Sequence, residues 1–289
     1  MKFGLASSTL QLLRLKFSFF LMPVYWFALS QVETIQFTNA VLIFVILHVL
    51  VYPASNGYNS YMDRDTSSIG GLEKPMLPTK QLFYATVFLD LIALVLSLFI
   101  SIYFFICVTL YIAASKAYSN RDIRLKKYPI LGFLVTIIFQ GAVVFFMVYH
   151  GVDVHKTITV PMLPIVASSF VIGSFYPLTQ IYQHKEDAAD GVKTLSILIG
   201  FNGTFIFSAV MYFIAMNILA YHFFSTLAIN SFIVFALSGI PILVYFFWWM
   251  LKVRKNNEEA NFKNTMQMNV IASVCTNAGF ICVLIIEKF

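Results

Sequence analysis

Long apolar runs, separated by short polar loops, follow one another along the whole chain. A hydrocarbon core about 30 Å thick requires about 20 apolar residues in each helix that crosses it. The run over residues 81–115 is too long for one such helix, so a tight turn is predicted near Ser97 to Ser101. About nine membrane helices are therefore predicted, at residues 17–29, 37–53, 81–98, 100–115, 129–148, 161–175, 195–223, 229–251 and 266–286.

The composition places the chain among membrane proteins. Hydrophobic residues make up 60% of its 289 residues and charged residues only 11%, which is far too apolar for a soluble domain of this length. The net charge of +6 would suggest nucleic-acid binding in a soluble protein. Here the basic residues fall in short loops between apolar runs, so we expect no nucleic-acid partner. The cysteines Cys107, Cys275 and Cys282 lie inside apolar runs without metal-ligand spacing, and we interpret them as packing residues.

The distribution of Lys and Arg predicts the orientation of the chain in the membrane. Basic residues accumulate on the cytoplasmic side of membrane proteins. With a cytoplasmic N-terminus, Lys2 and most other basic residues fall inside, and only Lys156 and Lys288 of the 19 Lys and Arg fall outside. A multi-pass protein of an inner or plasma membrane is therefore predicted, with its polar loops on the cytoplasmic side.

The first polar loop, over residues 54–80, carries oxygen donors at a helical spacing. Asn59 and Asp63 are four residues apart, so they share a face if the second helix continues into the loop, and Asp65 lies nearby. Mg²⁺ takes such oxygen ligands when it holds a substrate phosphate through one or two carboxylates. The alternative interpretation is a solvated loop with helix-capping Asp residues.

Two further cytoplasmic segments complement the first loop. The loop over residues 176–194 contains Glu186, Asp187 and Asp190, and facing carboxylates from both loops would each hold a magnesium ion on one diphosphate. Its alternative interpretation is a capped turn. Residues 117–129 offer basic contacts to phosphate oxygens, although anionic lipid headgroups also explain basic loops. These basic residues are Arg121, Arg124, Lys126 and Lys127.

Four motif segments lie in these predicted cytoplasmic loops. They are Asn59-Ser-Tyr-Met-Asp63-Arg-Asp65, Lys74-Pro75, the stretch from Tyr118-Ser119 to Arg124-Leu125-Lys126, and Asp187-Ala-Ala-Asp-Gly191-Val-Lys193-Thr194. In their order and place, these segments resemble the motifs of the UbiA superfamily of intramembrane prenyltransferases. The resemblance covers residues 1–289 as a single domain and implies an all-α bundle of transmembrane helices around a central cavity.

The resemblance also implies a chemistry. Mg²⁺ would neutralise the diphosphate of a prenyl donor, and the prenyl group would pass to a lipophilic acceptor, either an aromatic ring or a polyene. The metal ligands implied are Asn59, Asp63, Asp65, Glu186, Asp187 and Asp190, with Asp63 and Asp187 as the catalytic pair. The diphosphate contacts implied are Tyr118, Arg121, Arg124, Lys126 and Lys193.

Some positions depart from the family pattern and keep a second function open. Ser67 stands where the family usually has its last Asp, and Gln180 and Gln183 stand at second-motif aspartate positions. A neutral amide is a weaker magnesium ligand than a carboxylate. The alternative is therefore a family member that binds isoprenoid lipids or a partner without catalysis.

Two polar residues are predicted at membrane depth. Asp90 is expected either to be functional or to reach a Ser or Tyr on a neighbouring helix. His48 is expected to be a core histidine with its hydrogen bonds satisfied. A secondary transporter would need several charges near the bilayer midplane, which the sequence does not provide apart from Asp90.

Overall fold

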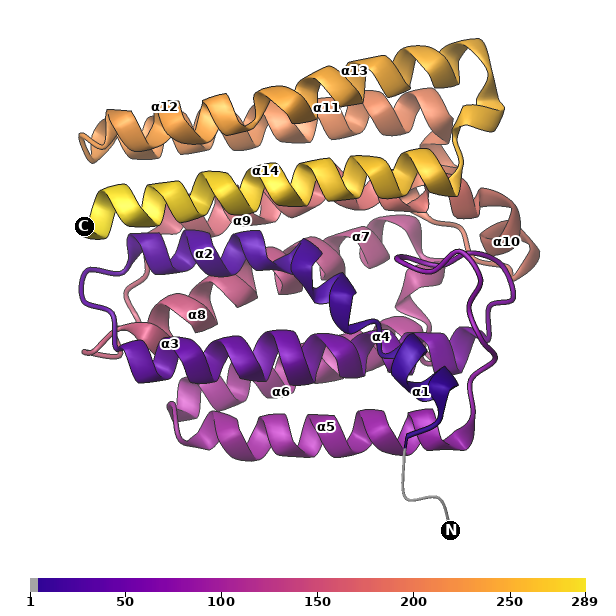
Figure 1. The fold of residues 1–289 in the computed structure, drawn as a ribbon, viewed down its shortest axis with the longest axis horizontal. Coiled ribbons are helices and arrows are strands. Elements are labelled where there is room, and N and C mark those ends of the chain that lie inside the picture. Colours follow the sequence, from indigo (N-terminus) through magenta and orange to yellow (C-terminus); the bar gives the residue numbers. More distant parts are fainter. Residues whose placement is uncertain (1–4) are drawn as a thin grey trace.

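The computed structural model describes residues 5–289, and the regular elements in that range are helices joined by loops (Figure 1). Lys2 lies outside the described residues. Within them, 9 helical segments are long and apolar enough to cross a membrane, which confirms the predicted number. These spans are Ser7–Gln31, Phe37–Asp63, Lys80–Leu98, Ile102–Ser119, Pro129–Val152, Met162–Ala189, Leu195–Ser225, Ile229–Lys255 and Phe262–Lys288.

Four of the nine spans, the first, second, fifth and sixth, combine α-helices with a 3₁₀ or π segment. The elements of the first half are α1 (Ser7–Leu12), η1 (Leu15–Leu21), α2 (Met22–Gln31), α3 (Phe37–Phe44), η2 (Val45–Val51), α4 (Tyr52–Asp63), α5 (Lys80–Leu98), α6 (Ile102–Ser119) and η3 (Leu125–Lys127). The second half continues with α7 (Pro129–Ile137), η4 (Ile138–Val143), α8 (Val144–Val152), α9 (Met162–Phe175), η5 (Tyr176–Gln183), α10 (His184–Ala189), α11 (Leu195–Ser225), α12 (Ile229–Ser238), α13 (Ile240–Lys255), η6 (Asn257–Glu259) and α14 (Phe262–Lys288).

Some of the predicted spans ended too early at the polar loops. The turn near Ser97 is confirmed, because α5 ends at Leu98 and α6 begins at Ile102. The second span, however, runs on to Asp63 and the sixth to Ala189. A span predicted from hydropathy ends where the hydrocarbon region of the membrane ends. The helix itself continues into the polar region, because its backbone hydrogen bonds continue there. These extensions carry the predicted site residues.

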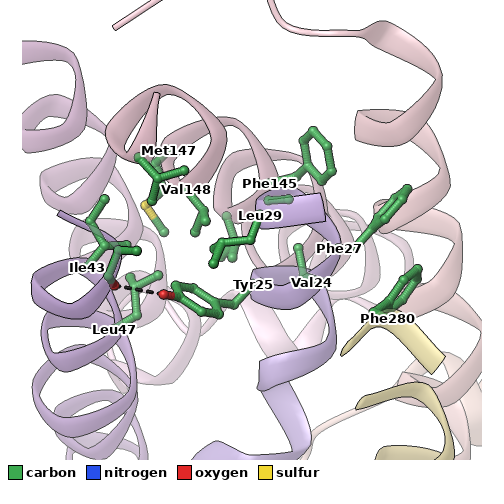
Figure 2. Close-up of a cluster of buried hydrophobic side chains, with 14 of the residues drawn as sticks. Val24, Tyr25, Phe27, Leu29, Ile43, Leu47, Phe145, Met147, Val148 and Phe280 are labelled. Atoms are coloured by element: carbon green, nitrogen blue, oxygen red, sulfur yellow. Dashed lines mark hydrogen bonds between the residues drawn. The ribbon is translucent and has the colours of Figure 1, made fainter. Parts of the chain in front are cut away.

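The largest buried cluster of apolar side chains lies among α2, α3 and α8, away from the polar loops (Figures 1 and 2). Phe27 is its centre, with its ring centroid 4.5 Å from that of Phe280 and 5.2 Å from that of Phe145. The hydroxyl of Tyr25 donates to the carbonyl of Ala40 at 2.7 Å, so this buried polar group is satisfied. Some members of this cluster, including Tyr52, Tyr111 and Val171, also line the cavity described below.

The two polar residues at membrane depth differ from their expected roles. Asp90 forms an ion pair with Lys116 at 2.7 Å, so its partner is a lysine instead of a Ser or Tyr. The Nδ1 atom of His48 lies 3.3 Å from the carbonyl of Phe44, but its Nε2 is buried without a partner. The prediction of a fully satisfied histidine was therefore wrong. The three cysteines are free.

Gly141 marks the closest approach between span five and α9. A Cβ on Gly141 would lie 2.5 Å from the Cα of Ser169, a distance that real side chains do not adopt. The neighbouring amide of Ala142 donates to the hydroxyl of Ser169 at 3.1 Å. Glycine at this position therefore lets the two backbones touch next to the cavity-lining Gln140.

We expect Gly141→Ala to lower the melting temperature in detergent by about 5 °C, because overpacking of this kind costs about 2 kcal/mol. Thermal unfolding followed by size-exclusion chromatography measures the change. The control is Ala113→Val, which adds more volume at an exposed position of α6 and should leave the melting temperature unchanged. Equal melting temperatures for both variants would contradict the close packing.

Candidate functional site

The end of α4 carries the first group of site residues. Asn59 and Asp63 share one face of this helix, as predicted, and the Nδ2 of Asn59 donates to Oδ2 of Asp63 at 2.8 Å. The same Nδ2 donates to the hydroxyl of Ser119 on α6 at 3.0 Å, and the hydroxyls of Ser55 and Ser115 pair at 2.5 Å one turn earlier. These contacts between α4 and α6 fix the Asp63 carboxylate at the helix end.

The basic segment between α6 and α7 lies against both acidic loops. Lys126 Nζ is 2.6 Å from Oδ1 of Asp63, and Arg121 donates to the carbonyls of Met62 at 2.6 Å and Asp63 at 3.1 Å. Arg121 thereby satisfies carbonyls at the C-terminus of α4. On the other side, Arg124 forms an ion pair with Asp190. The segment therefore links the two loops, which the sequence predicted to face each other.

The second loop brings one carboxylate back toward the first. Asp187, on α10, is half-buried and within electrostatic reach of Lys126, Asp63 and Asp65. Glu186 and Lys193 are exposed, and within residues 5–289 their side chains have no hydrogen-bond or ion-pair partner. Asp63, Asp65 and Asp187 are called the acidic cluster below. Of the predicted site residues, Lys193 is the one that the structure leaves apart from this cluster, whereas Glu186 lies within electrostatic reach of Asp187.

Within the acidic cluster, the charge of Asp65 is disfavoured by its surroundings. Burial raises the pKa of Asp65, and the neighbouring Asp63 charge raises it further, while Lys126 and Arg14 act in the opposite direction. In the part of the chain that the structure describes, no three His, Cys, Asp or Glu side chains stand close enough to hold a metal ion alone. A divalent cation here would therefore complete its coordination with water and substrate oxygens, which is how Mg²⁺ binds phosphates.

Arg14 is a site residue that the sequence reasoning missed. Its guanidinium donates to the carbonyls of Gly70 at 3.1 Å and Asn56 at 3.2 Å, and its Nε is buried without a partner. It also lies within electrostatic reach of Asp65 and Asp63. Its backbone is left-handed, with φ of 47°, between α1 and η1. The available signal was a basic residue just before the first apolar run, but Arg14 was counted with Lys2 and Lys16 only as a marker of topology.

A cavity of about 290 Å³ opens beside these residues. Its polar end includes Asn59, Arg14 and Tyr118, and the hydroxyl of Tyr118 pairs with that of Tyr176. Its other walls are largely aromatic and apolar, and they include Tyr52, Tyr111, Phe139, Val171 and Phe175. The arrangement joins an anion-binding polar end to a chamber that suits a hydrocarbon chain.

Gln180 and Gln183, two positions that depart from the family pattern, lie in different surroundings. Gln180 is buried, and its Oε1 accepts from the amide of Ser196 at 3.4 Å, while Gln183 lines the cavity. His184 bonds the hydroxyl of Ser196 at 2.7 Å and stacks on Phe201. Gln180 and His184 therefore brace the loop internally, and Gln183 is the one that faces the cavity.

The fold and site define a polytopic membrane protein with a polar-mouthed cavity in its helical bundle. The family profile described as the UbiA prenyltransferase family matches residues 20–271, and the chain belongs to this family. The curated proteins include none that matches this sequence.

Solved structures share the fold at low sequence identity. A UbiA homologue from Archaeoglobus fulgidus bound to GPP and Mg²⁺ superposes with a TM-score of 0.70 at 18% identity, over 96% of this chain and 99% of that one. The same homologue bound to DMAPP and Mg²⁺ gives a TM-score of 0.68 at 18% identity, over 97% and 100%. The apo structure of a UbiA homologue from Aeropyrum pernix K1 gives 0.68 at 17% identity, over 93% and 98%.

We expect Arg14→Met to loosen the loop over residues 64–79, because the variant loses both hydrogen bonds to backbone carbonyls. A glutamyl endopeptidase that cuts after Glu73 should cleave the variant about tenfold faster, the effect of losing about one net hydrogen bond. Arg64→Met is the matched control, since Arg64 is exposed on the same loop. Equal cleavage rates for the wild type and Arg14→Met would show that Arg14 does not hold the loop.

Proposed function

We propose that this protein transfers a prenyl group from a prenyl diphosphate to a lipophilic acceptor inside the membrane, with Mg²⁺ as its cofactor. The observation that carries the proposal is that the acidic cluster and Lys126 lie next to Asn59, which lines the polar end of an aromatic cavity and donates to Asp63. Membership of the UbiA prenyltransferase family supports it, as do the GPP and Mg²⁺ bound to the Archaeoglobus homologue.

The carboxylates and amide at this mouth are suited to hold the metal. Asn59 and Asp63 from one loop and Asp187 from the other supply hard oxygen donors, with Asp65 beside them. Glu186 and Asp190 remain proposed ligands from the second loop. For Asp190 this role requires release from Arg124, to which it is bonded in the structure.

The basic residues around the mouth are suited to hold the diphosphate. Lys126 and Arg124 are now paired with carboxylates, so a substrate phosphate would exchange with Asp63 and Asp190 as their partner. Arg121, Lys193 and Tyr118 complete the proposed phosphate contacts. Arg14 adds a further positive charge at the polar end of the cavity.

The reaction follows from this division of roles. When bound, Mg²⁺ acts as a Lewis acid toward the diphosphate leaving group. Lys126 and Arg124 stabilise the negative charge on the diphosphate as the allylic C–O bond breaks and its electron pair leaves with oxygen. The acceptor supplies the electron pair for the new bond and loses a proton to water. Cavity rings such as Tyr52, Tyr111 and Phe139 pack on the prenyl chain and present π-faces to the cation.

We also propose the orientation of the protein in the membrane. The N-terminus and the loops over residues 54–80 and 176–194 lie on the cytoplasmic side of an inner or plasma membrane. The positive-inside distribution of Lys and Arg supports this orientation. Water-soluble diphosphates would then reach the mouth from the cytoplasm, and the acceptor would arrive through the bilayer. Residues 1–289 form a single domain in this account.

A second candidate function is binding without catalysis. Gln180 is buried and accepts a hydrogen bond from the amide of Ser196 instead of lining the cavity, and Lys126 and Arg124 are paired with carboxylates of the protein itself. A protein of this kind would bind isoprenoid lipids or a partner and show saturable donor binding, with no product under any metal condition.

The central experiment compares wild type with Asp63→Asn in detergent, using radiolabelled prenyl diphosphates and a panel of acceptors. We expect a product with Mg²⁺, none with EDTA, and a loss of at least about a hundredfold in Asp63→Asn, because the variant removes the charge that holds the metal. Saturable donor binding without product across the panel would instead favour the second function.

Variants at Asp65 and Ser67 test which of these two residues completes the first motif. We expect Asp65→Asn to raise the Mg²⁺ concentration for half-maximal activity about tenfold, because it removes a carboxylate from the acidic cluster. Ser67→Ala should leave that concentration unchanged. The reverse pattern, in a magnesium titration of both variants, would show that Asp65 does not replace the missing family aspartate.

A further inference from the structure

The ion pair between Asp90 and Lys116 takes no part in the acidic cluster or its basic contacts. Asp90 lies in the middle of α5 and is only 8% exposed, and its Oδ2 is 2.7 Å from Nζ of Lys116 in the last turn of α6. A carboxylate at membrane depth is costly, and such residues usually serve a function. Two apolar side chains in its place would stabilise many proteins at least as well. The ion pair therefore needs an explanation other than stability.

The ammonium group of Lys116 also contacts Tyr58 of α4. Its Nζ lies 4.5 Å from the centroid of the Tyr58 ring, which is within the range of a cation–π contact. Tyr58 is only 6% exposed, and it directly precedes Asn59, the proposed metal ligand. Asp90 holds the ammonium group in this position by its charge. The ion pair therefore joins α5 and α6 to α4 beside the first motif.

Tyr58 is bonded in turn to the start of the basic segment over residues 121–127. Its hydroxyl accepts a hydrogen bond from Nδ2 of Asn120 at 3.3 Å. The Oδ1 of Asn120 accepts from the amides of Asp122 at 2.8 Å and Ile123 at 3.4 Å. A side-chain oxygen that bonds the amides two and three residues ahead stabilises a turn. Asn120 therefore links Tyr58 to the turn that leads into Arg124.

The ion pair lies behind the wall of the central cavity. Ser55 and Ser115, whose hydroxyls pair with each other, line both the cavity and a small pocket beside Asp90 and Lys116. Among the residues that the structure describes, Asp90 and Lys116 are not part of the cavity wall itself. Any effect of this pair on a substrate must therefore act through the residues that it holds in place.

We propose that the ion pair between Asp90 and Lys116 positions Tyr58 and, through Asn120, the basic segment that binds the donor diphosphate. Asp90 and Lys116 are positioning residues in this account. The inference rests on the proposed prenyl transfer, because the diphosphate belongs to its donor. An ion pair suits this role better than two apolar side chains, because the carboxylate fixes one point charge over the Tyr58 ring.

The first measurement is trypsin cleavage of the native protein in detergent, which requires no ligand. Trypsin cuts after the basic residues of the segment when that segment opens, and after Lys255 at the end of α13 as an internal reference. The variant is Asp90→Leu/Lys116→Met, which replaces the ion pair by apolar side chains and should keep the melting temperature of the wild type. We expect its basic segment to be cleaved about tenfold faster, with cleavage after Lys255 unchanged.

The second measurement is magnesium-dependent binding of labelled geranyl or geranylgeranyl diphosphate, whichever the wild type binds more tightly. We expect the double variant to bind it about tenfold more weakly, because its basic segment is less ordered. Tyr58→Phe keeps the ring but loses the hydroxyl, so it should bind at least about threefold more weakly. Lys116→Arg keeps both contacts and should bind like the wild type. The matched control Tyr84→Phe, at an exposed position of α5, should do the same.

The outcomes separate this inference from the proposed function. A double variant with the trypsin cleavage and donor binding of the wild type would overturn the inference and leave the ion pair a role in packing alone. If the double variant does not fold, Tyr58→Phe decides, and donor binding equal to that of the wild type overturns the inference. A wild type that binds neither diphosphate would instead overturn the proposed prenyl transfer, whatever the trypsin cleavage of the variants.

Discussion

The ion pair between Lys126 and Asp63 is the interaction on which the site depends. Asp63, Asp65 and Asp187 lie within electrostatic reach of one another there, and burial together with the neighbouring Asp63 charge raises the pKa of Asp65. Lys126 balances this charge at 2.6 Å from Asp63, and Arg124 holds Asp190 in the second loop. The segment between α6 and α7 therefore joins two motif loops, residues 54–80 and 176–194, that are far apart in the sequence.

Around this site, the helical bundle contains both a packed apolar core and a cavity. The aromatic cluster around Phe27, part of which Figure 2 shows, packs α2 against α8 and α14. Hydroxyl and amide contacts hold α4 against α6, and the residues that make them line the cavity. Prenyl transfer needs both features, because the cation must be kept from water while the diphosphate stays near it.

The sequence predicts the spans better than it predicts the site. The number of helices follows from the thickness of the bilayer, and the meeting of Asn59 with Asp63 follows from the pitch of a helix. The role of Arg14 depends on a left-handed residue and a distant loop, which no local pattern encodes. Likewise, Lys116 was seen only as a loop charge, although it neutralises Asp90. Contacts between remote segments, which tertiary packing alone decides, are what the sequence could not provide.

The most direct test of this account is a structure of the protein with Mn²⁺ in place of Mg²⁺ and a non-ionisable thiolo analogue of a prenyl diphosphate. The account predicts anomalous scattering from the metal between Asp63 and Asp187, with Lys126 moved from Asp63 to a phosphate oxygen. A diphosphate bound elsewhere, with Lys126 still paired to Asp63 and no metal at the acidic cluster, would contradict it.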